Sequence, residues 1–264
     1  MIEPYQFDNP TLNVIYNRKS IRNFENKPIP QELKDLIITG AMRAPTAGNM
    51  MFYSILEVED QQKKEQLART CDNQPFIATS PFILTFLADY QRWFDYYEHS
   101  NVQEMCNREN ITYNKPKESN LLMGVVDAVI AAQNAVIVAE SLGIGSCYIG
   151  DIMEHYEIHK DMFQLPKYVF PAAMVCFGYP AHPEKSEKIS ARFHKDLICF
   201  KNTYRTWSQS RIKEFDVNLN EIRKVPATYS ELENIGQYLY KFKSGADFSK
   251  EMIRSVKAML KNWT

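Results

Sequence analysis

The chain has 264 residues, of which 45% are hydrophobic, 24% charged and 12% aromatic. This is the composition of a soluble globular protein, with room for one large domain or for a domain and an appendage. The 31 Lys and Arg against 32 Asp and Glu leave a net charge of −1, so no overall field recruits nucleic acid or an acidic membrane surface. The N-terminus has neither the basic nor the apolar stretch of a signal peptide, and we expect a cytoplasmic protein.

The first third of the chain alternates amphipathic and apolar segments. Apolar residues at helical spacing predict a helix over Gln31–Arg43, which ends at a loop of small residues and breakers, Ala44–Asn49. Phe52–Val58 is aromatic and β-branched, and Pro81–Ala88 is a continuous apolar run. Both are expected to be strands, the second one buried on both faces. Asp60–Cys71 between them is expected to be a charged surface helix.

Leu121–Leu142 is the strongest predicted helix, and it is apolar nearly all round. Such a helix lies either in the core or between subunits. Four polar residues interrupt the run, which is too many for a membrane span: Asp127, Gln133, Asn134 and Glu140. We therefore expect a central helix and no contact with a membrane. The preceding stretch, Tyr90–Ser119, shows no clear period, and helix plus loop is expected there.

Beyond this helix the chain returns to short apolar runs. Ser146–Ile149 and Tyr168–Phe177 are expected to be strands, with a helix over Glu154–Phe163 between them. Short strands that alternate with helices predict mixed α/β layers around one sheet of about four or five strands.

The composition changes near residue 200, which divides the chain into residues 1–200 and an arm, residues 201–264. The arm holds twelve Lys and Arg but only seven Asp and Glu, a net charge of +5 against −6 for the rest. Opposite charges favour an arm that lies across its own domain or across a partner subunit. The many aromatic residues of the arm argue against disorder, so we expect it to be ordered.

Several common catalytic and metal-binding patterns are absent from the sequence. Five cysteines at wide, irregular spacing predict reduced thiols rather than a disulfide framework or a metal site. His155 and His159 have the i, i+4 spacing of two metal ligands, but no third ligand is evident, and two surface histidines are the simpler interpretation. The glycines of Gly143–Gly150 follow a helix and lack the G-x-G-x-x-G spacing of a dinucleotide-binding turn. There is no G-x-S-x-G elbow and no phosphate loop, so no catalytic side chain and no metal ligand is predicted.

Three segments place cationic or small residues in loops beside apolar elements. The first offers three cations and a hydroxyl within five positions: Arg18, Lys19, Ser20 and Arg22. Such a cluster can grip a phosphate, and a solvated basic turn is the alternative. The second, Pro45–Asn49, allows a planar ligand to approach the backbone closely. The third, Lys185–Arg192, follows a predicted buried strand, and a solvated charge run is the alternative there.

In this order the segments resemble the flavin-dependent nitroreductase family. Arg18–Phe24 resembles its R-x-S-x-R-x-F signature, and Arg43–Asn49 resembles its A-P-[ST]-x-x-N loop. Gln74–Phe82 resembles the segment before its second strand, and Asp127–Gly150 resembles its central helix and the following turn. The basic stretch after Gly178 matches by position. The resemblance covers about three-quarters of the chain, and five motifs in register make it specific.

The resemblance implies an α+β fold with a mixed or mainly antiparallel sheet wrapped by helices. It implies an intertwined homodimer that binds FMN at the subunit interface, with residues 1–200 as the FMN-binding domain and the arm packing on the dimer. The implied activity is an FMN-dependent NAD(P)H oxidoreductase that reduces nitroaromatics, quinones or flavins by ping-pong hydride transfer through flavin N5. The length and the arm resemble the larger, oxygen-insensitive, NADPH-preferring subgroup. A branch with other flavin chemistry, such as reductive dehalogenation or flavin breakdown, and a non-catalytic flavin-binding dimer stay open as alternatives.

The resemblance also implies a set of cofactor-binding residues. The FMN phosphate and ribityl chain would be held by Arg18, Lys19, Ser20, Arg22, Lys188 and Arg192. Gln74 would bind an edge of the flavin ring. The backbone that would line the ring comes from Pro45, Thr46, Ala47, Gly48 and Asn49 and from Ile149, Gly150 and Asp151.

Two departures from the family pattern concern this set. Asn49-Met50-Met51 lacks a Gln that many members carry, which would remove one polar contact to the flavin. Lys188 and Arg192 are four positions apart, where some relatives have K-P-R.

The arm of the larger subgroup would cross to the partner subunit and border the substrate pocket. Arg205 or Arg211 would then attract the extra phosphate of NADPH, because a guanidinium matches a phosphate with two hydrogen bonds. The alternative is an arm that only buttresses the dimer. The physiological electron acceptor, a small molecule, is not identified by the sequence.

Overall fold

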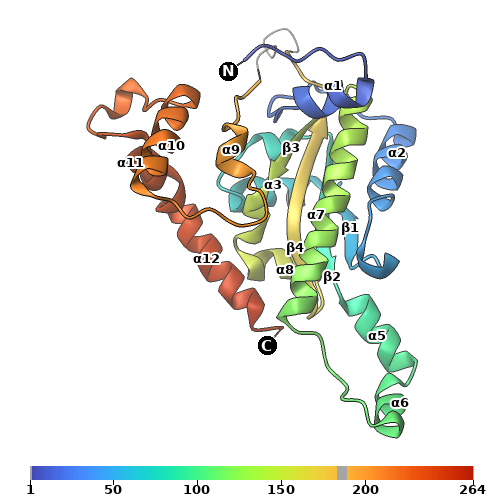
Figure 1. Ribbon diagram of the computed structural model, residues 1–264. Coiled ribbons are helices and arrows are strands. Elements are labelled where there is room, and N and C mark those ends of the chain that lie inside the picture. The colour runs from blue at the N-terminus through green and yellow to red at the C-terminus, as the bar shows by residue number, and fades with distance from the viewer. Residues whose placement is uncertain (1, 183–188, 264) are drawn as a thin grey trace.

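The computed structural model describes residues 2–182 and 189–263 and is built around one four-stranded sheet (Figure 1). Its strands are β1 (Tyr53–Glu57), β2 (Phe82–Asp89), β3 (Gly145–Ile149) and β4 (Val169–Gly178). The spatial order is β1-β2-β4-β3, and every neighbouring pair is antiparallel. The fold is therefore α+β with an antiparallel sheet, as the resemblance implied, and each predicted strand lies within about one residue of its observed bounds.

Helices cover both faces of the sheet. On one face lie α2 (Gln31–Met42) and the long α7 (Glu118–Ser141), which contact each other and share a core with β2 and β4. On the other face lie α3 (Gln61–Thr70), α4 (Phe76–Thr79), the 3₁₀ turn η2 (Gly150–Met153) and α8 (Tyr156–Phe163). Figure 1 shows α7 crossing in front of the sheet with α2 beside it and α3 behind. The sheet is thus enclosed between two apolar layers.

The two central strands are buried along their whole length, which explains their continuous apolar sequences. Their pairing is interrupted once, where Phe86 faces Ala173 but Leu87 faces Pro171, so that Ala172 is an extra residue in β4. Proline has no N–H to give to a sheet, and a bulge is one of the few places where a central strand tolerates it.

The two faces of α7 differ in exposure, and the first alternative that the sequence offered, a helix in the core, is confirmed for one of them. Small residues on one face pack into the core with no exposure: Ala128, Ala131, Ala132 and Ala135. A stripe on the opposite face is open to solvent in the single chain: Leu122 is 66% exposed, Val126 52% and Val129 41%. We call these three residues the α7 stripe. Exposed apolar stripes of this kind are typical of interaction surfaces.

α7 is long and apolar enough to cross a membrane by length and composition alone, but its polar side chains are used inside the fold. Asp127 accepts hydrogen bonds from the backbone N–H groups of Ala47 (3.2 Å) and Phe52 (3.1 Å). Glu140 accepts one from the hydroxyl of Ser146 (2.8 Å). Asn134 donates to the carbonyl of Gly40 (3.3 Å). These contacts tie α7 to α2, β3 and the start of β1, as expected of a core helix.

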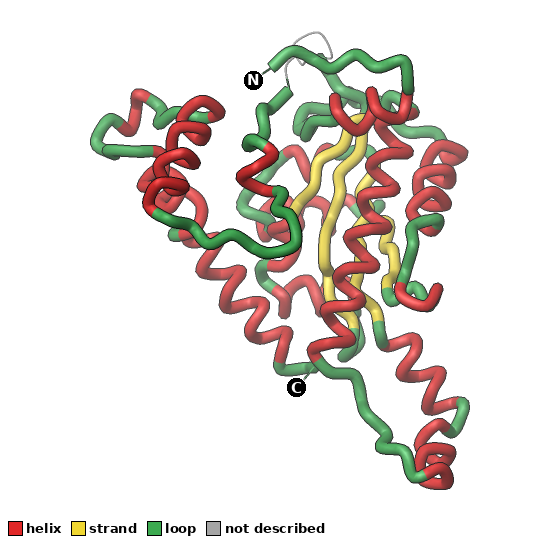
Figure 2. Tube along the Cα trace, viewed as in Figure 1, coloured by secondary structure: helices red, strands yellow, loops and turns green. Residues whose placement is uncertain are grey.

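Further helices lie beyond the two opposite ends of the sheet. α1 (Pro10–Asn17) lies at the upper end in Figure 1, and the pair α5 (Gln91–His99) and α6 (Val102–Glu109) projects at the lower end. A long loop, residues 110–117, returns from α6 to α7 (Figure 2). The expected helix plus loop over Tyr90–Ser119 is therefore confirmed as two helices and a loop.

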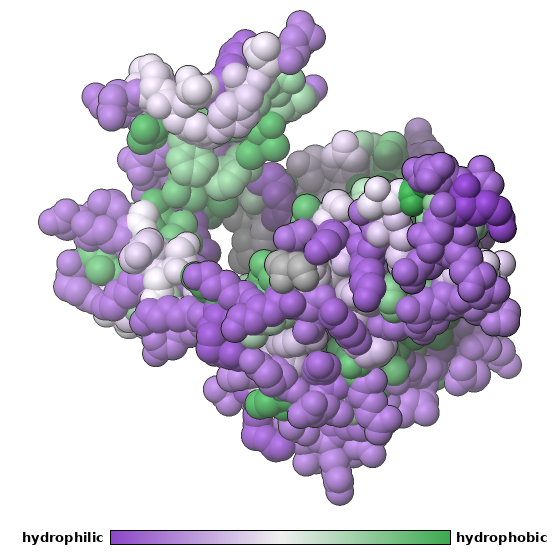
Figure 3. Space-filling view, turned by 90° about the horizontal axis from the view of Figure 1, so that it is seen from below, coloured by the Kyte–Doolittle hydropathy of each residue, from purple (hydrophilic) through white to green (hydrophobic). Residues whose placement is uncertain are grey.

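The C-terminal part is ordered and helical. It comprises α9 (Lys195–Ile198), α10 (Gln209–Ile222), the 3₁₀ turn η4 (Ala227–Tyr229), α11 (Ile235–Leu239), the π-helical turn η5 (Tyr240–Ser244) and α12 (Asp247–Leu260). A second long loop, residues 199–208, leads from α9 to α10 (Figure 2). α10 and α11 form a lobe at the left, and Figure 3 shows apolar residues on its side toward the body with a hollow between the two.

The last helix, α12, packs on its own chain. The hydroxyl of Ser255 donates to the carbonyl of Met153 (2.6 Å) and accepts from the N–H of Tyr156 (2.9 Å). Trp263 is 1% exposed, and its ring meets that of Tyr168 edge-on with centroids 5.3 Å apart. Arg254 forms a bidentate ion pair with Glu157. The end of the arm is therefore part of the core of its own subunit.

Two expectations about single residues have clear outcomes. All five cysteines are free; four are buried and Cys199 is exposed. The expectation of two surface histidines is wrong for His159, which is fully buried. His155 lies outside the helix in a left-handed conformation (φ 47°), so α8 begins at Tyr156 instead of Glu154. His159 lies on the inward face of α8, between Thr70 and the carbonyl of Ile152.

Candidate functional site

The basic segment after α1 is held against the ends of two strands by its backbone. The N–H of Ile21 donates to the carbonyl of Ser146 at the start of β3 (2.9 Å). The N–H of Glu25 donates to the carbonyl of Tyr179 just after β4 (2.8 Å). Glycine allows this close approach, because a Cβ on Gly178 would lie 2.7 Å from the ring of Phe24. The segment therefore has a defined position at one end of the sheet.

The Arg18 side chain has the features of an anion-binding group. Its Nη1 atom is buried and has no hydrogen-bond partner. Arg18 lies close enough to Glu140 and Tyr148 to lower the pKa of both, although burial is the larger effect and raises the pKa of Glu140 and brings that of Tyr148 to about 12. A buried guanidinium N–H without an acceptor is costly, and an anionic ligand would satisfy it.

A cavity of about 530 Å³ connects this segment with the basic stretch beyond β4. Arg18 and Arg192 both line it, together with Lys195 and a set of apolar and aromatic side chains from α1 and the N-terminal residues. The structure thus brings two of the predicted phosphate-binding cations to one cavity. Lys188, predicted to act with them, lies outside the described residues.

β3 connects this basic cluster with the predicted ring-binding residues, because it is an edge strand of the sheet. In the described part of the chain its outer edge is paired only through the bridge between Ser20 and Ser146. Arg22 lies near the thiol of Cys147, the next residue of β3, and lowers its pKa, although burial has the larger and opposite effect. The predicted backbone residues Ile149, Gly150 and Asp151 follow at the other end, roughly 15 Å along the strand.

Gln74 meets Asp151 at that far end. Its Nε2 donates to Oδ2 of Asp151 (2.8 Å) and to the carbonyl of Cys71 (3.0 Å). The turn that delivers Gln74 contains two left-handed residues, Asp72 (φ 55°) and Asn73 (φ 49°). Two residues that the sequence places far apart therefore form one polar contact at the end of β3.

Glu154, which the sequence analysis missed, lies beside this contact. It is 2% exposed, and its Oε1 has no hydrogen-bond partner. Burial, together with the nearby charges of Asp151, Asp72 and Glu251, raises the pKa of Glu154 to about 8. His159, on the next helix, is neutral at pH 7, because burial lowers its pKa to about 4. Only tertiary packing identifies these groups, since neither stands in a recognisable motif.

We expect the stability of the protein to fall between pH 5 and pH 8 because of Glu154. The folded state keeps the Glu154 proton up to about pH 8, whereas the unfolded chain releases it near pH 4.5. The folded state therefore binds more protons in this window, and the free energy of unfolding decreases as pH rises. Glu154→Gln removes this dependence. The free energy of unfolding of the variant, relative to that of wild type, should therefore increase with pH, by at most about 4 kcal/mol at pH 8.

Thermal unfolding of both proteins at pH 5, 6, 7 and 8 tests this expectation. Glu157→Gln is the matched control, because the ion pair with Arg254 lowers the pKa of Glu157 to about 2. The contribution of this ion pair to the free energy of unfolding is complete at pH 5 and is lost only as pH falls toward 2. Glu157→Gln should therefore shift the midpoint temperature of unfolding by the same amount at all four pH values. A constant difference between Glu154→Gln and wild type would contradict the raised pKa of Glu154.

The small-residue loop at the end of α2 is held in an unusual conformation. Gly48 and Asn49 both have φ 57°, and Met51 has φ 49°, the left-handed region that Met rarely adopts. The N–H of Met51 donates to the hydroxyl of Thr46 (3.2 Å), and its carbonyl accepts from Arg92 (2.6 Å). Backbone strain that is over-determined in this way is typical of ligand-binding loops.

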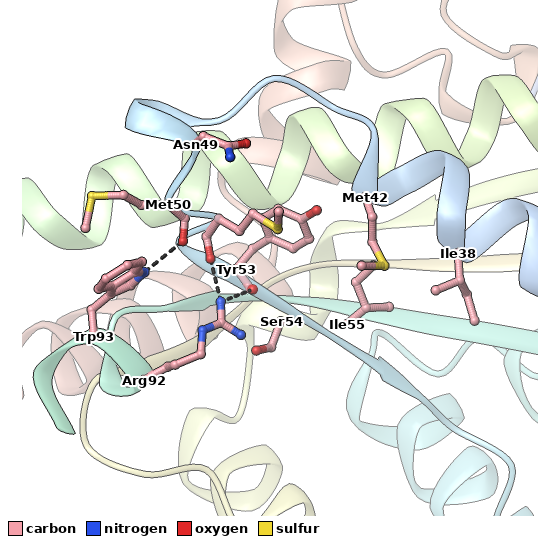
Figure 4. A pocket seen from close by; sticks show the side chains of 10 residues that line it. Ile38, Met42, Asn49, Met50, Tyr53, Ser54, Ile55, Arg92 and Trp93 are labelled. Atoms are coloured by element: carbon pink, nitrogen blue, oxygen red, sulfur yellow. Dashed lines mark hydrogen bonds between the residues drawn. The ribbon is translucent and has the colours of Figure 1, made fainter. Parts of the chain in front are cut away.

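A cavity of about 480 Å³ lies beside this loop, between α2, the edge strand β1 and α5 (Figure 4). Met42, Met50 and Ile55 make it largely apolar, and the indole N–H of Trp93 donates to the carbonyl of Met50 (2.7 Å). Arg92 and Trp93 were also missed in the sequence, because Tyr90–Ser119 has no clear period.

Within one chain the loop and the basic cluster are far apart. The loop binds α7 at Asp127, whereas Arg18 and Lys19 lie near Glu140. Thirteen residues separate these points of α7, which is about 20 Å at 1.5 Å per residue. The structure therefore groups the predicted site residues into two sets: the basic cluster, β3 edge and Gln74 in one set, and residues 45–49 in the other.

The arm residues proposed for NADPH differ in their surroundings. The guanidinium of Arg211 lies between the rings of Phe200 and Trp207, 5.0 and 5.2 Å from their centroids, and donates to the carbonyl of Asp196 (3.0 Å). Arg205 is exposed. Among residues 2–182 and 189–263, no group of three His, Cys, Asp or Glu side chains could hold a metal ion.

Comparison with known proteins identifies the family to which the chain belongs. The model of the nitroreductase family matches residues 15–179, which include the basic cluster, the loop at residues 45–49, Gln74 and the whole of β3. The chain belongs to the nitroreductase family. The matched region ends just after β4, so the arm lies outside it.

Relatives of this nitroreductase-family chain span most of its length. The NADPH-dependent FMN reductase of Bacillus subtilis is 30% identical over 84% of this chain and 81% of its own. The oxygen-insensitive NADPH nitroreductase of Salmonella typhimurium is 28% identical over 80% of this chain and 82% of its own. The solved structure of NfrA2 from B. megaterium has a TM-score of 0.77 at 25% identity and covers 97% of both chains, so the arm also has a structural counterpart.

Proposed function

We propose that this protein is an FMN-dependent NAD(P)H oxidoreductase that reduces a nitroaromatic, a quinone or a flavin with ping-pong kinetics. The observation that carries the proposal is the buried, unpartnered Nη1 of Arg18 in a basic cluster at the open edge of β3. The relatives that share this region are named as NADPH-dependent FMN reductases and nitroreductases. Both ends of the β3 edge carry groups that suit FMN.

At one end, Arg18, Arg22 and Arg192 would hold the phosphate, and Lys19 and Ser20 would add contacts to it and to the ribityl chain. Arg18 and Arg192 already face one cavity, and a phosphate would provide the acceptor that Nη1 of Arg18 lacks. At the other end, Gln74 and the backbone of residues 149–151 would contact the flavin ring. Lys188 belongs to the proposed set by sequence position.

FMN, when bound, accepts a hydride from the nicotinamide and passes electrons on to the second substrate. The protein's own residues bind and orient the flavin and the substrates. The cations of the basic cluster fix the phosphate and thereby the position of the ring along β3. We propose no side chain as a catalytic acid or base, and none of the described residues near the β3 edge stands out for that role.

We further propose a homodimer in which each flavin site is shared. The loop at residues 45–49 precedes β1, and β1 and β3 are the two opposite edges of the sheet. A loop at the β1 edge would therefore line a flavin held at the β3 edge of a second subunit. The exposed α7 stripe supplies an apolar surface for that second subunit. Residues 1–200 would then form the FMN-binding unit, and residues 201–264 the arm that packs on the dimer.

The arm supports assignment to the larger, NADPH-preferring subgroup. Several of its apolar side chains are exposed in the single chain, among them Tyr204 (70%), Tyr240 (69%) and Val217 (61%). We propose that this surface contacts the partner subunit. Arg205 has a free guanidinium for the extra phosphate of NADPH, whereas Arg211 is held between two rings, so Arg205 is the better candidate. A cytoplasmic location suits a consumer of NADPH.

Anaerobic spectroscopy of the purified protein tests this function. The protein should be yellow and should bleach when NADPH is added, and the colour should return with menadione, a nitroaromatic or free FMN. A yellow protein that does not bleach with NADPH or NADH would favour a non-catalytic flavin-binding dimer. A protein that bleaches but reduces none of these acceptors would favour a family branch with other flavin chemistry, and colourless protein with no affinity for FMN would contradict the proposal.

A further inference from the structure

The amide group of Gln74 can take only one orientation. Both partners of its Nε2, the carbonyl of Cys71 and the carboxylate of Asp151, are acceptors without a proton to donate. A rotated amide would place Oε1 against these two oxygens and lose both hydrogen bonds. The observed orientation therefore commits the two donor hydrogens of Gln74 to the protein and leaves Oε1 for a ligand.

Asp151 is the partner that contributes most to fixing the orientation of the Gln74 amide. A hydrogen bond to a charged carboxylate is roughly twice as strong as one between neutral groups. Asp151 belongs to η2, at the end of β3, and Glu154 from the same turn lies behind it. The backbone of Gln74 is also held, because its N–H donates to the carbonyl of Ala68 (2.8 Å).

We propose that Asp151 is a positioning residue that turns Oε1 of Gln74 toward the flavin, so that the site recognises a hydrogen-bond donor on the ring edge. This inference rests on the proposed function. The oxidised flavin ring has one N–H donor, at N3, between two carbonyl acceptors. Gln74 would accept from N3, and the side chain of Asp151 would act on the flavin only through Gln74.

The test compares binding of FMN with binding of N3-methyl-FMN, which lacks this donor, by quenching of flavin fluorescence. The methyl group adds the same steric cost in every variant, so changes in the affinity ratio report the hydrogen bond. Asp151→Leu removes the stronger of the two acceptors, so only the neutral carbonyl of Cys71 still opposes rotation of the amide. We expect the preference of the wild type for FMN to fall by about three- to tenfold in this variant, the worth of one hydrogen bond.

Four further variants test whether the effect is specific to the contact between Asp151 and Gln74. Asp151→Asn keeps an amide oxygen that can accept from Nε2, so it should retain most of the preference. Asp72→Asn removes a nearby charge without touching Gln74 and should leave the ratio unchanged. Gln74→Leu should lose the preference as Asp151→Leu does, and the double variant should lose no more, because the two residues act as one unit.

The outcomes separate this inference from the function on which it rests. If wild type binds FMN and Asp151→Leu weakens FMN and N3-methyl-FMN equally, the positioning role is overturned and the function stands. If Asp151→Leu does not fold, Gln74→Leu decides, and an unchanged ratio in that variant overturns the role. If the wild type binds no FMN at all, the proposed function is overturned and this inference with it.

Discussion

Replacing Val129 with aspartate is expected to yield a folded monomer that has lost most of its affinity for FMN. Val129 is 41% exposed in the single chain and belongs to the α7 stripe, so the substitution leaves the subunit core intact. In the proposed dimer the carboxylate would be buried without a partner, at a cost of about 3–5 kcal/mol. That corresponds to a dissociation constant raised roughly a hundred- to several-thousandfold. FMN affinity falls too, because each flavin would lose the partner's loop.

Sedimentation velocity and FMN titration of the same sample measure both effects. Ala132→Asp is the control from the opposite face of α7: Ala132 has no exposure, so its carboxylate would lie in the core and the subunit itself should fail to fold. Glu118→Gln, at the exposed start of α7, should change neither property. A Val129→Asp protein that is still dimeric and yellow would show that the α7 stripe is not the dimer interface.

Arg18→Ala is expected to weaken FMN binding by roughly ten- to a hundredfold. The variant would remove one or two hydrogen bonds to a charged phosphate, each worth about 1.5–3 kcal/mol. Nη1 of Arg18 has no hydrogen-bond partner to lose, but the charge of Arg18 lies near the buried carboxyl group of Glu140. Because these two effects on the free energy of unfolding oppose each other, the apoprotein should fold and should differ little from wild type in stability.

Equilibrium dialysis with FMN and with riboflavin distinguishes a phosphate contact from general damage. Riboflavin lacks the phosphate, so its affinity should change little in Arg18→Ala, while that of FMN falls. Arg69→Ala, an arginine on the exposed side of α3, is the matched control and should bind both ligands normally. Equal loss of both ligands, or unchanged FMN affinity, would exclude Arg18 from the phosphate site.

The sequence predicts best those elements whose pattern is local. The four strands are apolar runs bounded by breakers, and α7 is a long apolar helix, so all five are found within a few residues. The basic segment was recognisable because four candidate phosphate-binding residues stand within five positions. α10 and α11 have no comparable pattern, since the arm forms a lobe with exposed apolar residues instead of one clear amphipathic face.

What the sequence could not show are contacts between distant residues. Asp127 counted only as a polar interruption of α7, yet it binds two backbone N–H groups some eighty residues away. Gln74 and Asp151 are 77 positions apart and meet only because β3 ends beside the turn after α3. His159 is buried because it shares the inward face of α8 with Tyr156, three positions before it, and the sequence does not show which face of this short helix packs on the body.

The extra residue in β4 governs how the two central strands can align. Both strands are apolar on both faces, so a slip of one position would exchange one buried apolar face for another and would not be opposed by the usual contrast of polar and apolar sides. The interruption beside Pro171 supplies another constraint, because the extra residue Ala172 fits only where the ladder is irregular, and Pro171 next to it has no N–H to donate to a regular ladder. The bulge and the imino acid together therefore favour one alignment of β2 and β4, and because β3 pairs with the end of β4, that alignment also bears on where β3 and its open edge lie.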